Sequence, residues 1–376
     1  LCFCLGCQIG TSTIEGDGAI SVRTGDGLLS NPELQAIVDL QVDRDALGLA
    51  EMLSARDPSL RARAAFALGS IQEPSTFTIL ASRLQSEEEA VVRRDIAFAI
   101  GQLNNEASVP ILADVLVRET EHDVRYRIME ALGKVGSVSA SEALLSADVV
   151  PEEEPLRVLA LAVNGAVSDV NDVQSRDLLF SKLDDPNADI RVAAAYYFGR
   201  VTDTSLWSSG VSRLREVLDL YAEDEPAALH LIVALGRLGD DSDVERLIRW
   251  AGVAQDWRVR AEAIAGLSGR ESQPEVLEVL LNSLDDSSEH VAARAAIGIA
   301  SRNHSPEIIT RIKSWIDSDL GRGSVAEPLL QLLGRQNEGL FVFSWLDSLQ
   351  LDDLASWKVG VAALSQISGI EALQRL

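Results

Sequence analysis

Leu60-Arg61-Ala62-Arg63-Ala64-Ala65-Phe66-Ala67-Leu68-Gly69 is the stretch that decides the fold, because it recurs twice in close succession. The copies are Val92-Arg93-Arg94-Asp95-Ile96-Ala97-Phe98-Ala99-Ile100-Gly101 and Val124-Arg125-Tyr126-Arg127-Ile128-Met129-Glu130-Ala131-Leu132-Gly133. Looser copies end at Gly165, Gly199, Gly236, Ser268, Ala300, Gly334 and Ser365. A period of about 31 to 37 residues, present about ten times, is the signature of a repeat protein.

Each copy contains two apolar helical segments, the first exemplified by residues 76–84 and the second by the Val-Arg segment itself. Turns rich in Asp, Pro and Ser separate the two, and nothing alternates with the period of two that a strand requires. The closing Gly, as in Gly69, is expected at the helix C-cap, where a positive φ is needed. One such pair cannot bury its apolar face alone, so we predict an all-α solenoid that stacks into a curved right-handed superhelix.

This pattern resembles the HEAT repeat, including the bilin-lyase-like bacterial subclass with its Val-Arg…Ala-Leu-Gly helix. The resemblance covers residues 32–376, where Asn31-Pro32 offers an N-cap and a first-turn proline. It implies a scaffold that binds protein or peptide.

The repeated arginines Arg61, Arg93, Arg125, Arg157 and Arg191 allow two interpretations. They could clamp acidic partners, or they could form an internal ladder with turn carboxylates such as Asp57, Asp123 and Asp189. Helical phase favours the ladder, because at about 100° per residue the apolar positions three, four and seven residues after each arginine flank it. The arginine therefore lies at the buried seam between repeats.

The positions two, five and nine residues after each arginine lie opposite that seam, at about 140° to 200°. Aromatic and basic side chains gather on this face in the first five repeats, and they would line a groove for a peptide or an acidic partner segment. The alternative is that neighbouring helices lie so close that the rings pack on one another. The candidate groove residues, including the adjacent Arg94 and Tyr126, are Arg63, Phe66, Arg94, Phe98, Gln102, Tyr126, Arg127, Lys134, Tyr196 and Arg200; later repeats place His230, Arg237, Arg294 and Ile297 on the same face.

The amino-acid composition argues against several classes of ligand. The chain has 33 Lys and Arg against 58 Asp and Glu, a formal net charge of −25, which argues against binding nucleic acid. Three of the four histidines lie in turns, no pair of them has metal-ligand spacing, and the folded part contains no cysteine, so neither a metal nor another cofactor is expected. The tryptophans that cluster in the later repeats, such as Trp250, Trp257 and Trp345, are expected to fill gaps between repeats.

The N-terminal segment indicates export. Residues 1–7 contain all three cysteines, and Leu5-Gly6-Cys7 resembles a bacterial lipobox in which Cys7 is lipidated. Residues 8–31, rich in Gly, Thr, Ser and Asp, are expected to form a flexible linker. This predicts an exported protein, either soluble in the periplasm or an outer-membrane-anchored lipoprotein whose only membrane contact is the lipid. The solenoid is expected to be cut within a repeat at its C-terminal end.

The segments 23–41 and 61–70 resemble the start of bacterial proteins that join a HEAT array to a cyclophilin-type peptidyl-prolyl isomerase domain. That resemblance implies that the repeats recruit client proteins, with isomerase chemistry in a following domain, because the chain itself has no catalytic constellation. Two alternatives stay open: a bilin-lyase-like enzyme and a purely structural spacer.

Overall fold

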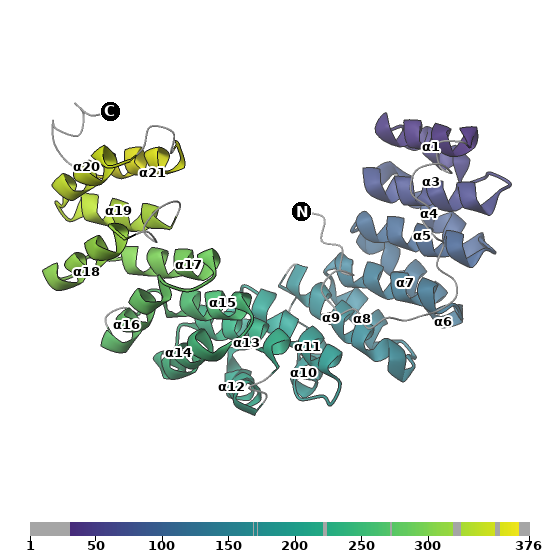
Figure 1. Cartoon of the computed structure of the whole chain (residues 1–376). Helices are drawn as coiled ribbons and strands as arrows, with labels where there is room; N and C mark the ends of the chain where they lie inside the picture. The colour runs from purple at the N-terminus through teal and green to yellow at the C-terminus, as the bar shows by residue number, and fades with distance from the viewer. Residues whose placement is uncertain are drawn as a thin grey trace. The chain divides into compact units, whose positions relative to one another are not determined.

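The computed structural model describes residues 31–367, apart from 168, 171, 221–223, 271–272, 319–324 and 350–353. All regular secondary structure in these residues is helical (Figure 1). The chain divides into two compact units at Val217–Leu218, and each is described by itself. The predicted all-α repeat architecture is confirmed.

Unit 1 is built from pairs of antiparallel helices. Its helices are α1 (Pro32–Val42), α2 (Ala46–Met52), α3 (Pro58–Ile71), α4 (Phe77–Ser86), α5 (Ala90–Gln102), α6 (Val109–Arg118), α7 (His122–Val135), α8 (Val138–Ser146), α9 (Glu154–Val167), α10 (Val173–Ser181) and α11 (Ala188–Arg200), with α12 (Val211–Leu220) at the unit boundary. From α3 to α11 the odd-numbered helices carry the repeated Val-Arg segment, or its looser form. They pack directly on one another, α3 on α5, α5 on α7, α7 on α9 and α9 on α11.

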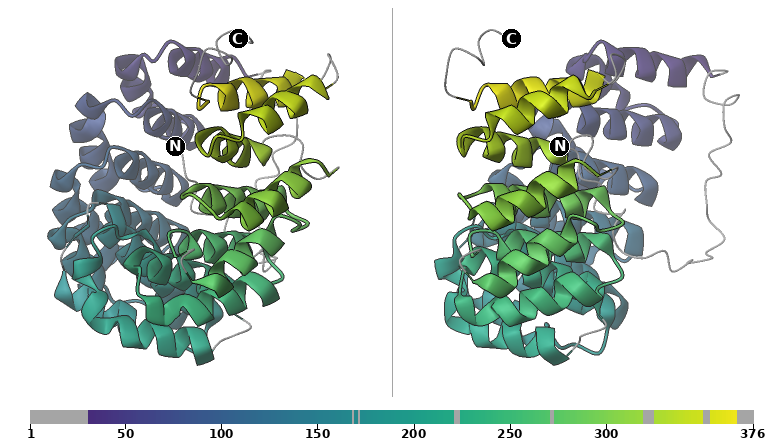
Figure 2. Two further views of the ribbon diagram at one scale, coloured as in Figure 1. Left: turned by 90° about the vertical axis from the view of Figure 1, so that its left-hand side faces the viewer. Right: turned by 60° about the vertical axis from the view of Figure 1, so that its left-hand side comes forward.

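Unit 2 continues the pattern with α13 (Glu225–Leu238), α14 (Val244–Val253), α15 (Trp257–Leu267), α16 (Pro274–Ser283), α17 (Glu289–Ala300), α18 (Pro306–Ile316), α19 (Ala326–Arg335), α20 (Gly339–Asp347) and α21 (Leu354–Leu364). Again the odd-numbered helices pack in succession, and Figure 2 shows them from two further sides. None of the helices in the described ranges has the length and apolar character needed to cross a membrane.

N-cap side chains stabilise the first turns of α1 and α3, and the first of these caps, Asn31, is the one that the sequence predicts. The Asn31 side chain accepts hydrogen bonds from the backbone N–H of Glu33 at 2.9 Å and of Leu34, with Pro32 in the first turn of α1. Asp57 accepts from the N–H of Ser59 at 2.8 Å and so caps α3.

The expectation that the repeated glycine is a C-cap is wrong. Gly101 lies inside α5, and the positive φ falls three residues later, at Asn104 (48°). The same offset separates Gly69 from Gln72 (55°) and Gly133 from Gly136 (68°). A Cβ on Gly101 would lie 2.9 Å from Cα of Ala131 on α7. The glycine is therefore required because the backbones of adjacent helices approach closely.

Candidate functional site

The repeated arginines form a buried ladder at the seam. The guanidinium of Arg61 donates to both carboxylate oxygens of Glu87, at 2.9 and 2.7 Å, and to the carbonyl oxygens of Ala55 and Arg56. Arg93 pairs with Glu119 in the same way, at 2.7 and 3.0 Å. The ladder interpretation is confirmed, and these arginines are engaged inside the fold rather than presented to a partner.

The carboxylates of the ladder are not those expected from the sequence. For four arginines the carboxylate lies 26 to 28 residues later, before the Val-Arg helix of the next repeat: Glu87, Glu119 and Glu153 in unit 1, and Asp286 for Arg260 in unit 2. Arg157 instead pairs with Glu154 of its own helix α9, at 2.6 Å. Asp57, one of the expected partners, caps its own helix instead. The hydrogen bonds of Arg125 hold the pKa of Glu153 below its ordinary value, although burial opposes the shift.

Opposite the seam, two phenylalanines from successive repeats stack on one another. The ring centroids of Phe66 (α3) and Phe98 (α5) are 5.3 Å apart and the rings are inclined by 12°. The alternative that neighbouring rings pack together is therefore confirmed for this pair. Phe66 nevertheless keeps 45% of its surface exposed, and Phe98 is half-buried, so the stack still presents an apolar face to solvent.

Cationic side chains surround this stack. The guanidinium carbon of Arg63 lies 5.8 Å from the Phe66 ring centre, and that of Arg127 lies 5.9 Å from Phe98 and 5.6 Å from Tyr126. The Lys134 ammonium is 5.7 Å from the Phe98 ring. These are cation–π distances. We call the set Arg63, Phe66, Phe98, Tyr126, Arg127 and Lys134 the aromatic strip.

The aromatic strip is less basic than its sequence suggests. Glu130 accepts hydrogen bonds from Arg127 at 2.5 Å and from Lys134 at 2.8 Å, and its side chain is only 8% exposed. Burial alone would raise the pKa of Glu130, but the hydrogen bond and charge of Lys134, with Arg127, lower it. The negative charge of Glu130 therefore neutralises one of the two positive charges beside Phe98.

The remaining predicted residues stand apart from the strip. Arg94 pairs with its neighbour Asp95 at 2.8 Å, and Gln102 accepts from Gln72 at 3.3 Å. Tyr196 and Arg200 form their own cation–π pair on α11, at 5.4 Å. Cys7, the predicted lipidation site, lies outside the described residues.

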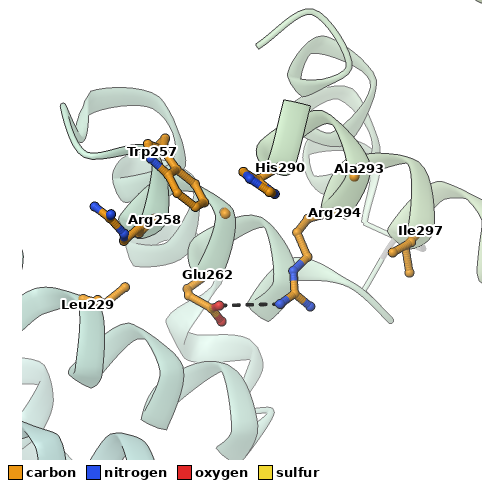
Figure 3. A pocket seen from close by; sticks show the side chains of 9 residues that line it. Leu229, Trp257, Arg258, Glu262, His290, Ala293, Arg294 and Ile297 are labelled. Carbon is orange, nitrogen blue, oxygen red and sulfur yellow. Dashed lines mark ion pairs between the residues drawn. The ribbon is translucent and has the colours of Figure 1, made fainter. Parts of the chain in front are cut away.

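Unit 2 contains a pocket on the corresponding helix face that the sequence did not reveal. It has a volume of about 450 Å³ and lies over α13, α15 and α17 (Figure 3). Trp257 and His290 stack at one side, with ring centroids 4.6 Å apart and planes inclined by 22°. Trp257 is half-buried and packs on His290 of the next repeat, as expected of a ring between repeats, while its indole also lines this pocket. Trp250 and Trp345 are buried as expected.

Metal binding finds no support in the described part of the chain, where no group of three or more His, Cys, Asp or Glu side chains is placed to hold an ion.

A sequence model of the HEAT repeat matches residues 46–116, 79–162 and 211–300, together more than half of the chain. The chain belongs to the HEAT-repeat family. This HEAT protein matches no curated protein sequence.

Solved structures share its fold at low identity. A chain in a structure of Kap95p with RanGDP aligns over 89% of this HEAT protein and 51% of its own length, with 13% identity and a TM-score of 0.52. An engineered protein aligns over 86% and 99% respectively, with 19% identity and a TM-score of 0.46. A chain of the CpcE–CpcF phycocyanin lyase complex of Nostoc sp. aligns over 70% and 91%, with 19% identity and a TM-score of 0.36. At these identities the likeness concerns the fold.

Proposed function

We propose that this HEAT protein is a binding scaffold whose aromatic strip holds an extended segment of another protein. The observation that carries the proposal is the Phe66–Phe98 stack, which leaves 45% of Phe66 in solvent on a face ringed by cations. Exposed aromatic rings beside arginine are the side chains that most often dominate binding energy at protein interfaces.

The strip favours a partner with an apolar side chain next to an acidic one. The apolar side chain would cover Phe66, and a carboxylate would meet the cations at the edge of the stack. Because Glu130 already binds Arg127 and Lys134, the net attraction for carboxylate is modest. The apolar contact therefore supplies most of the affinity.

Selection of peptides on the immobilised chain from a random display library tests the proposal. Enriched peptides are expected to carry aromatic or aliphatic residues beside Asp or Glu. Phe66→Glu removes the partly exposed ring with its stack on Phe98 and adds a negative charge. It is expected to weaken peptide binding by about 2 kcal/mol, a typical loss for one aromatic anchor. Fluorescence anisotropy of a labelled peptide measures the change.

A matched control lies on the other helices of the same repeats. Ile79 on α4 and Val117 on α6 are exposed apolar residues outside the strip, and Ile79→Ala with Val117→Ala should leave affinity unchanged. Peptides that bind the Phe66→Glu protein as tightly as the wild type would reject the aromatic strip as the site.

We further propose that the scaffold works in an exported, lipid-anchored bacterial protein and recruits clients for peptidyl-prolyl isomerisation. The support is the lipobox-like Leu5-Gly6-Cys7 segment and the resemblance of segments 23–41 and 61–70 to HEAT–cyclophilin proteins. Metabolic labelling with a fatty acid, in bacteria that express the complete reading frame, should label the protein. Cys7→Ala should abolish the label, and a label that persists would contradict lipidation at this cysteine.

A further inference from the structure

We propose that the pocket of unit 2 is a second binding site, which takes an acidic side chain of an extended peptide together with its apolar neighbour. The pocket is lined from α13 by Leu229, from α15 by Trp257, Arg258, Ala261 and Glu262, and from α17 by His290, Ala293, Arg294 and Ile297 (Figure 3). It belongs to a different unit from the aromatic strip, so it can be tested separately.

The pocket exists because two side chains are small. Ala261 and Ala293 occupy the repeat position directly after the ladder arginine position, where α5 and α7 carry Arg94 and Tyr126. Methyl groups at both places leave room between α15 and α17, where a longer side chain would project into the pocket. A volume of about 450 Å³ lies within the range of about 300–1,000 Å³ found for ligand pockets.

The walls of the pocket suit an apolar side chain. The stacked Trp257 and His290 rings form one wall, and Leu229 and Ile297 add aliphatic surface from the flanking helices. Ile297 is 55% exposed, so an occupant that covers it removes apolar surface from water. Because the rings already pack on one another, little freedom is lost when the site is filled.

The charges of the pocket suit a carboxylate. Arg294 approaches Glu262 at 3.6 Å, which is longer than a hydrogen bond, so the guanidinium retains donors for another acceptor. Arg258 lies over the Trp257 ring at 5.0 Å and donates one long hydrogen bond to Asp256, at 3.4 Å. Two arginines thus face one pocket carboxylate, and arginine binds carboxylates through paired hydrogen bonds.

The acidity of the whole chain does not cancel this preference. Charges further away than about 10 Å are largely screened at ordinary ionic strength. The lining itself carries two arginines and one carboxylate, so it favours an acidic peptide over a basic one.

The experiment uses the full chain labelled with 5-fluorotryptophan, whose fluorine resonance for residue 257 is assigned by its loss in Trp257→Phe. The probe is an N-acetylated, amidated hexapeptide with one aspartate between two leucines and glycine elsewhere. A second peptide replaces the aspartate by asparagine, which has the same shape without the charge. We expect a saturable shift of the residue 257 resonance with the first peptide and at least tenfold weaker binding of the second.

Two substitutions test the assigned residues. Arg294→Gln removes the guanidinium at a half-exposed helix position and should weaken the aspartate peptide at least tenfold. Arg311→Gln makes the same charge change on α18, where Arg311 pairs with Glu278 away from the pocket, and should leave binding unchanged. Ala293→Leu fills the hollow and should abolish the shift while helicity is retained.

Equal binding of the two peptides, or no shift of the residue 257 resonance at millimolar peptide, would overturn the proposal, and so would binding that survives both Arg294→Gln and Ala293→Leu. Phe66→Glu should not alter the shift. The outcome therefore separates this pocket from the function proposed for the aromatic strip.

Discussion

At the residue scale, Glu87 shows how one buried carboxylate joins two repeats. It accepts from Arg61, from Arg83 at 2.9 Å and from the backbone N–H of Glu89 at 3.1 Å. Burial alone would raise the pKa of Glu87, but these hydrogen bonds outweigh it and lower the pKa to about 2. A carboxylate with a depressed pKa stabilises the fold above its unfolded pKa of about 4.3, and the stabilisation is lost as the pH falls towards 2.

Glu87→Gln should therefore lower the free energy of unfolding at pH 7 by about 3 kcal/mol, because it leaves the Arg61 guanidinium buried without its counter-charge. The wild-type protein should lose stability between about pH 5 and pH 2, and the variant should lose less over that window. Urea denaturation at pH 7, 5 and 3 measures both effects.

The exposed neighbour Glu88 supplies the control, since Glu88→Gln changes no ladder side chain and should shift stability by less than about 0.5 kcal/mol. Parallel pH curves for wild type and Glu87→Gln would show that this carboxylate does not cause the acid sensitivity.

At the element scale, helix propensity and helix packing make opposite predictions for the repeated glycine. Alanine is favoured over glycine inside a helix by about 1 kcal/mol. At Gly101, however, a Cβ would lie 2.9 Å from both Cα and Cβ of Ala131, so α5 and α7 would have to separate. Gly101→Ala should therefore destabilise the protein by about 1–3 kcal/mol, as overpacking does.

Gly252 on α14 is the matched control, because it is exposed and a Cβ there has nothing within 4 Å. Gly252→Ala should raise stability by about 0.5–1 kcal/mol. Thermal denaturation of the two variants measures the difference, and a gain at both positions would mean that the close approach does not constrain Gly101.

The same glycine shows what the sequence could and could not predict about the elements. The 32-residue repeat predicted the helix pairs, the seam and the buried arginine. It did not locate the helix ends, because Gln72 and Asn104 adopt the left-handed conformation that only a glycine was expected to take. Nor did it identify Glu87 as the partner of Arg61, because that pairing depends on how the next turn folds back.

At the scale of the whole molecule, the two candidate sites differ in how far the sequence predicted them. The aromatic strip was predicted because its residues are large and recur at one helical phase. The sequence analysis missed the pocket because Ala261 and Ala293 mark it only by having small side chains. In addition, Leu229, Trp257 and His290 come from three repeats. Arg294 and Ile297 were placed on the correct face, which was the only signal available.

Because each repeat packs mainly on its neighbours, a core defect should stay local. Leu132 on α7 and Leu280 on α16 are both fully buried. Leu132→Ala and Leu280→Ala should each cost about 2–5 kcal/mol through loss of apolar contact and the cavity left behind. Leu132→Ala should speed amide hydrogen exchange in α5, α7 and α9, and Leu280→Ala should do so in α15, α16 and α17.

Mass spectrometry of exchanged peptides distinguishes the two patterns, and each variant is the control for the other. If either substitution accelerated exchange evenly along both units, the chain would unfold as one cooperative body. Local effects would instead allow the candidate binding surface of one unit to be altered while the other is left intact. The separate tests of Phe66 and Arg294 depend on that independence.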